Sequence, residues 1–146
     1  MENKMRVFGS LFLLLGVALG AFASHALENF VAAEGKQAFE TAVRYLIYHG
    51  LGLLILSLMP YKKTADRKTV FYLLTLGISL FSGSIMVLVF KEMIPFSIRW
   101  IGPITPIGGT LLLVGWFWNV RTFLKNSLFR LIVSKVSDVF FNRHCH

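Results

Sequence analysis

The sequence predicts an all-α integral membrane protein: a four-helix bundle with both termini in the cytoplasm and a C-terminal amphipathic helix on the membrane surface. Two observations predict the bundle. The 146-residue chain is 55% apolar with only 15% charged residues, and the charges leave gaps over residues 7–27, 45–61, 70–90 and 101–120. Each gap is close to the roughly 20 residues that cross a hydrocarbon core about 30 Å thick. We therefore place one transmembrane domain over residues 1–121, with spans at about 7–27, 42–60, 69–90 and 103–121.

The placement of the basic residues predicts the orientation. The formal net charge is +8, and most of the 15 Lys and Arg residues lie before the first span, between the second and third, or after the fourth. The positive-inside rule therefore places both termini in the cytoplasm. Because these residues do not line one face of a helix, we expect the lipid bilayer as partner and no nucleic acid. The basic residues on the predicted cytoplasmic side are Lys4, Arg6, Lys62, Lys63, Arg67, Lys68, Arg121, Lys125, Arg130, Lys135 and Arg143.

The first span has two interpretations. Gly16, Gly20 and Ser24 recur at every fourth position, a spacing that lets another membrane helix pack closely. Alternatively, the basic N-terminus, the apolar run and the sequence Ala-Phe-Ala over residues 21–23 are typical of a secretory signal peptide. The topology of the remaining chain is the same under both interpretations.

The second and third spans are defined by periodicity. From Gln37 onward the apolar positions repeat with a helical period, so the second helix is expected to begin above the membrane and enter it near Tyr45. In the third span, Thr75, Ser79, Ser82 and Gly83 share one face at spacings of four, three and one. That face is expected to lie inside the bundle.

The fourth span begins with the unusual segment 102–109, which contains Gly102, Pro103, Pro106, Gly108 and Gly109. Proline suits the first turn of a helix, where its missing amide hydrogen costs least. The two prolines leave carbonyl oxygens without amide donors, and the glycines permit a neighbouring helix to approach. We expect these carbonyls to accept hydrogen bonds from histidines of other spans.

The tail, residues 122–146, alternates apolar and polar positions with a helical period. We expect it to lie on the cytoplasmic leaflet with its basic side chains near anionic lipid headgroups. The single cysteine, Cys145, rules out an intrachain disulfide. Its two flanking histidines are possible ligands for zinc or copper, although a solvated tail is the commoner role of such a chain end.

Polar and ionisable side chains of all four spans are predicted to meet at one level in the outer half of the bilayer. Ionisable residues within a membrane are costly and are therefore candidates for function. Arg44 is expected to reach the interface or to pair with Glu28 or Glu40. The predicted polar cluster comprises His25, Arg44, Tyr45, Tyr48, His49, Ser82, Ser84 and Thr105.

Three roles are open for this cluster: structural hydrogen bonding or solute contact, proton handling, and metal or haem binding by His25 and His49. No carboxylate lies inside a predicted span, which disfavours a proton-coupled transporter. The sequence contains no G-x-S-x-G, no H-E-x-x-H and no glycine-rich phosphate loop. We therefore expect no catalytic residue, no cofactor and no resident metal.

Four segments in order resemble one known family. They are residues 20–27 (GAFASHAL), 41–50 (TAVRYLIYHG), 81–84 (FSGS) and 102–109 (GPITPIGG), the last followed by Gly115-Trp116. Together they resemble the domain of unknown function 423 family of small four-helix membrane proteins, which includes transmembrane protein 256. The resemblance covers about residues 5–121. It implies a protein of the bacterial cytoplasmic membrane without an established activity or any assigned catalytic residue.

The chain departs from that family at two places. The family usually has a Gly-Ala pair where this chain has Ala23-Ser24, and often a tryptophan at Phe39 or Glu40. Small residues persist at the first place, so close helix packing is still expected. The tail lies outside the resemblance.

The sequence favours a non-enzymatic accessory or assembly factor that acts through a membrane protein partner or a homo-oligomer. The first alternative is a permease for ions or small solutes, formed by an oligomer because four short helices leave little room for a pore. The second is a haem- or metal-binding membrane subunit.

Overall fold

The protein is all-α. The computed structural model describes residues 1–59, 61, 63–95 and 97–144, and the side chains of those residues up to Lys125. Four long helices, α1 (Glu2–His25), α2 (Ala33–Leu58), α3 (Thr64–Val89) and α4 (Ile104–His144), are joined by loops that contain the short 3-10 helices η1 (Leu27–Asn29) and η2 (Arg99–Ile101). All four are long and apolar enough to cross a membrane, which confirms the predicted number of helices.

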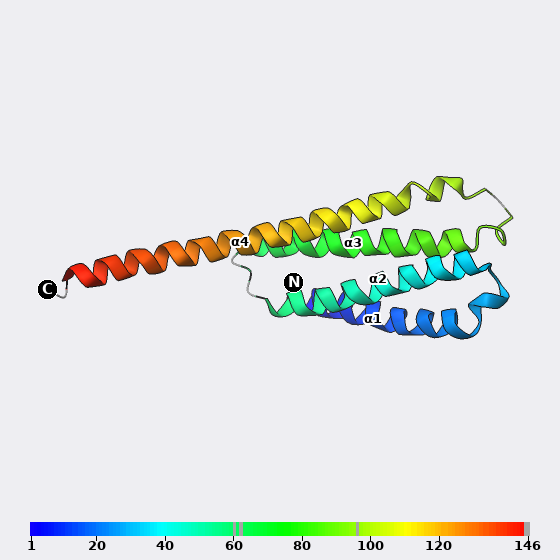
Figure 1. Ribbon diagram of the computed structural model, residues 1–146, viewed down its shortest axis with the longest axis horizontal. Helices are drawn as coiled ribbons and strands as arrows, with labels where there is room; N and C mark the ends of the chain where they lie inside the picture. Colours follow the sequence, from blue (N-terminus) through cyan, green and yellow to red (C-terminus); the bar gives the residue numbers. More distant parts are fainter. Residues whose placement is uncertain (60, 62, 96, 145–146) are drawn as a thin grey trace.

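The helices form two antiparallel hairpins, α1 with α2 and α3 with α4, and α2 packs against α3 (Figure 1). Glycines bring the helices of the first hairpin into backbone contact. A Cβ added at Gly9 would lie 2.8 Å from the carbonyl oxygen of Gly50, and one at Gly16 would lie 2.5 Å from Cγ1 of Ile47. Neither distance is tolerated, so these positions require glycine at this helix separation.

The second hairpin is packed in the same way. A Cβ added at Gly108 would collide with the backbone nitrogen of Phe81, and one at Gly77 would lie 3.0 Å from the backbone nitrogen of Leu112. Two of the other glycines predicted to pack closely, Gly20 and Gly109, make ordinary contacts at 3.6 and 3.7 Å. Gly83 differs from the prediction, since a Cβ there would meet nothing within 4 Å.

The start of α4 has its prolines where a helix tolerates them, as predicted. Pro103 immediately precedes Ile104, the first residue of the helix, and Pro106 lies in its first turn, where a missing amide hydrogen leaves no helical bond unmade. The carbonyl of Pro103 accepts from the amide of Ile107 at 3.4 Å, and that of Pro106 accepts from Oγ1 of Thr110 at 2.8 Å. A Cβ at Gly102 would meet only the carbonyl oxygen of Arg99, in its own turn.

Apolar side chains fill the interior and also cover the outside. One core cluster includes Phe12, Leu53 and Leu74 in the half of the bundle nearer the N-terminus, and a second includes Leu27 and Phe39 at the other end. Large apolar side chains also face outward: those more than 60% exposed include Val7, Leu14, Val17, Leu58, Leu113 and Phe117. An exterior of this kind suits a lipid environment rather than water.

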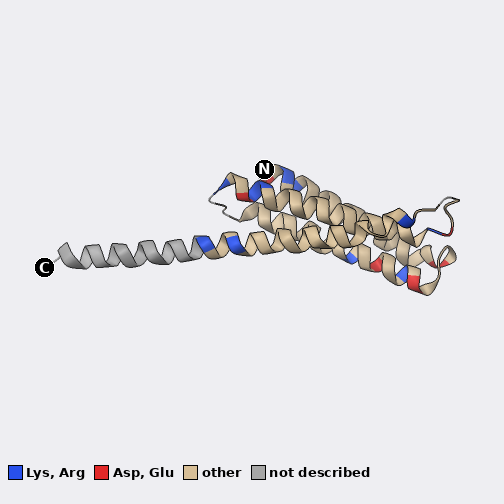
Figure 2. Ribbon diagram, turned by 90° about the horizontal axis from the view of Figure 1, so that it is seen from above, with Lys and Arg blue, Asp and Glu red and all other residues tan. Residues whose placement is uncertain are grey.

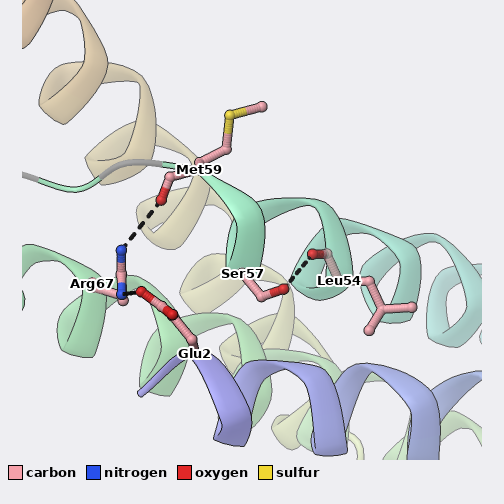
Figure 3. A network of polar contacts seen from close by, with 5 residues as sticks. All are labelled: Glu2, Leu54, Ser57, Met59 and Arg67. Carbon is pink, nitrogen blue, oxygen red and sulfur yellow. Dashed lines mark hydrogen bonds and ion pairs between the residues drawn. The ribbon is translucent and has the colours of Figure 1, made fainter.

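The predicted cytoplasmic segments share one end of the bundle. Arg67, early in α3, forms an ion pair with Glu2 and donates to the carbonyl of Met59 at 3.3 Å (Figure 3). Tyr61, between α2 and α3, donates to Oδ1 of Asn119 on α4 at 2.7 Å. The N-terminus, the α2–α3 connection and the middle of α4 are thereby held together. Lys and Arg residues gather there (Figure 2).

The C-terminal part of α4 corresponds to the predicted amphipathic tail. The helix runs as one element of 41 residues to His144 and extends past the other three (Figure 1). The side chains that define the predicted amphipathic face from residue 126 onward, and residues 145–146, lie outside the described part of the chain. Placement of the tail on the membrane surface stays a prediction.

Candidate functional site

His49 is the only ionisable side chain among the buried residues that the structure describes, at 8% exposure. Its Nδ1 lies 2.8 Å from the carbonyl oxygen of Tyr45, and its Nε2 lies 3.2 Å from Nε1 of Trp116. An indole nitrogen can only donate, so Nε2 of His49 must accept and Nδ1 must carry the hydrogen. The ring is therefore neutral, and both of its nitrogens are engaged.

Aromatic rings surround this histidine. Tyr45 stacks on His49 with ring centroids 5.9 Å apart, and Phe81 approaches Tyr45 at 4.8 Å. A groove of about 380 Å³ lies between α2 on one side and α3 and α4 on the other; it is lined by Tyr45, His49, Phe81, Gly109, Leu112, Leu113 and Trp116. This volume is near the lower end of the roughly 300–1,000 Å³ typical of small-molecule pockets.

The predicted serines and threonine join helices. Oγ of Ser82 donates to the main-chain carbonyl of Ala42 at 2.8 Å, linking α3 to α2. The hydroxyls of Ser84 and Thr105 lie 2.7 Å apart, linking the end of α3 to the start of α4. Both serines are buried. They act within the described structure as interhelical hydrogen-bond donors or acceptors.

Three members of the predicted cluster lie elsewhere. His25 is exposed at the end of α1, and Arg44 and Tyr48 are exposed on the outer face of α2. Arg44 donates to Oγ1 of Thr41 at 3.1 Å and pairs with neither Glu28 nor Glu40.

The two histidines do not share a site. Gly9 lies against Gly50 and Gly16 against Ile47, so His49 is level with residues 10–14 of α1, and His25 lies about 16–22 Å further along that helix. A haem or metal site built from both histidines is therefore incompatible with this arrangement. The carbonyl that His49 contacts belongs to Tyr45 of its own helix, not to the segment 102–109 as expected.

The depth of His49 also differs from the prediction. The contacts Gly9–Gly50, Gly16–Ile47, Ala42–Ser82 and His49–Trp116 align the four helices. They put His49 level with residues 10–14, 75 and 116. These positions lie three to seven residues, or about 5–10 Å, from the centres of the low-charge runs, on the side of the N-terminus. With the predicted orientation, His49 is in the inner half of the bilayer, not the outer half.

Sequence reasoning missed two groups of residues. Trp116 was noted only as part of a motif, although an indole N–H in a membrane span needs an acceptor. The second group is the network of Glu2, Tyr61, Arg67 and Asn119 at the N-terminal end. There, burial raises the pKa of the Tyr61 hydroxyl to about 12, and the neighbouring Arg67 guanidinium, 5.2 Å from the ring, partly opposes the shift.

A larger cavity, about 820 Å³, opens at the opposite end of the bundle. The α1–α2 connection, the start of α2, the end of α3 and Thr105 form its walls, and Glu28, Glu34, Lys91 and Glu92 are its charged lining residues. Glu28 is paired with Lys36 at 3.1 Å. In the described part of the chain, no three His, Cys, Asp or Glu side chains are grouped closely enough to hold a metal ion.

Comparison with known proteins decides the family. The family model described as "Protein of unknown function (DUF423)" matches residues 19–109, which include Ser82, Ser84 and His49 but not Trp116, the α4 partner of His49. The chain belongs to the DUF423 family, and its relatives include UPF0382 membrane proteins. The resemblance seen in the sequence is thus confirmed.

Several bacterial members of the DUF423 family are similar over most of their length. A UPF0382 membrane protein of Staphylococcus saprophyticus is 42% identical over 119 residues, which cover 80% of this chain and 95% of the relative. YwdK of Bacillus subtilis is 35% identical over 83% of this chain and 98% of its own. A relative from Haemophilus influenzae is 35% identical over 80% and 90%. No solved structure matches this DUF423 protein.

Proposed function

We propose that this protein is a non-enzymatic accessory or assembly factor of the bacterial cytoplasmic membrane, which acts by packing against other membrane proteins. The observation that carries the proposal is that both ring nitrogens of His49 already have hydrogen-bond partners. Its two nitrogens are held by Tyr45 and Trp116, so the buried histidine serves helix association and offers neither a free ligand atom nor a free proton acceptor.

Two other buried polar groups favour the same role. Ser82 and Ser84 are each engaged in a separate contact between helices. In the described part of the chain, no hydrogen bond connects them with His49 into a polar path. The groove beside His49 is lined mainly by aromatic and apolar groups, which also disfavours a permease formed inside one copy of the chain.

The orientation with both termini in the cytoplasm belongs to the proposal. Its support is that the N-terminus, the α2–α3 connection and Asn119 of α4, just before the basic residues Arg121 and Lys125, are held together at one end. Lys and Arg residues gather there (Figure 2), as the positive-inside rule requires of a cytoplasmic side. The tail would then lie near anionic lipid headgroups of the inner leaflet. A reporter fused after Lys63 should be cytoplasmic, and a periplasmic reporter would contradict this orientation.

The proposed role is tested in cells and with purified protein. Native electrophoresis of membranes from cells lacking the protein should show one membrane complex reduced or missing, and the wild-type gene should restore it. The purified protein should show no Soret band, no stoichiometric metal and no flux of ions or small polar solutes above empty vesicles. Unchanged complexes together with a positive result in any of these assays would overturn the proposal.

A further inference from the structure

Arg44 lies at the middle of the bundle's height, with its side chain on the outside. The contacts of Gly9 with Gly50 and of Gly16 with Ile47 place Arg44 level with residues 15–19 of α1. The bond from Ser82 to Ala42 places it level with Leu80 of α3, and the bond from Trp116 to His49 places it level with Leu111 of α4. Contacts with the other three helices thus agree on its depth.

These positions on α1, α3 and α4 are near the centres of the low-charge runs 7–27, 70–90 and 101–120. Arg44 is therefore near the centre of the hydrocarbon core, and the headgroups on either side are about 15 Å away. That distance is about ten helical residues, which is more than an arginine side chain can span by extending along its helix. An arginine at this depth needs a protein partner rather than lipid.

Arg44 is part of a polar stripe on α2, formed by Gln37, Thr41, Arg44 and Tyr48. Their spacings of four, three and four residues put them on one face of the helix. Tyr48 is 61% exposed, and among the described residues the Arg44 side chain hydrogen-bonds only to Thr41. The exposed faces of α1 and α4 near this depth are apolar instead, as at Val17 and Leu113.

A carboxylate of the same helix lies beside this stripe. Glu40 precedes Arg44 by one turn, is partly exposed and forms no ion pair with any described residue. The face of α2 thus carries one positive and one negative group, and neither forms an ion pair with a described residue of its own chain.

We propose that this face of α2 binds a second copy of the chain. Copies inserted in the same orientation are related by a two-fold axis along the membrane normal, so equal depths of α2 meet. That axis brings the two α2 helices together at equal depths, so Glu40 of one copy lies one helical turn, about 6 Å, from the depth of Arg44 of the other, within the reach of an arginine side chain that extends toward it. The surface is therefore complementary to itself in charge. This proposal does not depend on the accessory role.

Disulfide cross-linking in native membranes tests the interface, in a Cys145→Ser background. Tyr48→Cys should yield a cross-linked dimer. Val17→Cys and Leu113→Cys, which are at least as exposed but lie on α1 and α4, should yield none. No dimer with Tyr48→Cys, or equal dimer with the two controls, would overturn the proposal.

Charge reversal tests the pairing with purified protein in lipid vesicles, with dimerisation measured by energy transfer between labelled copies. Arg44→Glu and Glu40→Arg should each weaken dimerisation by about three- to twentyfold, the range that interhelical polar contacts support. The double reversal should restore it, which also shows that the variants fold. A monomeric wild type, or a double reversal no better than the single variants, would overturn the proposal; in the first case another membrane protein covers Arg44.

Discussion

Nε1 of Trp116 donates a hydrogen bond to Nε2 of His49, 3.2 Å away, and so joins α4 of one hairpin to α2 of the other. A single donor from α4 thereby decides the tautomer of the buried histidine. The bond also connects two hairpins whose own helices are held together by glycine contacts. It makes His49 part of the packing of the bundle.

Removing the indole donor should weaken the bundle. Trp116→Phe leaves Nε2 of His49 without a partner and should lower the free energy of unfolding by about 0.6–2 kcal/mol, as expected for a polar contact between membrane helices. Trp100→Phe is the matched control, since Trp100 is 68% exposed and donates to no described residue. Thermal unfolding in detergent measures both variants, and equal midpoints would contradict the role of the bond.

The stability cost of replacing a glycine by alanine should depend on what surrounds that glycine. Gly108→Ala forces a Cβ against the backbone of Phe81 and should destabilise the protein by about 1–3 kcal/mol, the cost of overpacking. Gly83→Ala is the control on the opposing helix, where a Cβ meets nothing within 4 Å; there the higher helix propensity of alanine should leave stability unchanged or slightly raised. Equal losses at both positions would show that the α3–α4 contact is looser than described.

The hydroxyl of Tyr61 should make stability fall at high pH. Its pKa is raised to about 12 in the folded protein from an ordinary 10.0, so the neutral form is favoured by folding. The stabilisation is fully present below pH 10 and is lost as the pH rises from 10 to 12. Tyrosinate absorbance of wild type minus Tyr61→Phe should show a group titrating near pH 12. A difference titration centred at 10 would contradict the buried environment.

Much of the fold follows from the sequence for identifiable reasons. The four helices are predicted because gaps between charges match the thickness of a bilayer. The start of α4 is predicted because Pro103 and Pro106 tolerate only a first turn. The contact of Gly16 is predicted from its spacing to Gly20, although only Gly16 is at a distance that excludes a side chain.

The candidate site was predicted less well, because charges mark where spans end but not which residues of neighbouring helices lie at the same depth. Arg44 was taken as the outer boundary of its span, which moved His49 into the outer half. The register is set instead by the pairing of Gly9 with Gly50, and a sequence does not state which glycines meet. The partner of His49 was missed for the same reason, since Trp116 is 67 residues away in the chain.

The central claim is that both ring nitrogens of His49 are engaged in structural hydrogen bonds, so that His49 binds neither a proton nor a metal. Nitrogen NMR of imidazole-labelled protein in lipid bilayers tests it most directly, with Trp116→Phe as a reference for the broken bond. The account predicts a neutral His49 ring with its hydrogen on Nδ1 and an accepting Nε2 whose resonance changes in Trp116→Phe. A hydrogen on Nε2, an imidazolium ring, or a resonance indifferent to Trp116→Phe would contradict it.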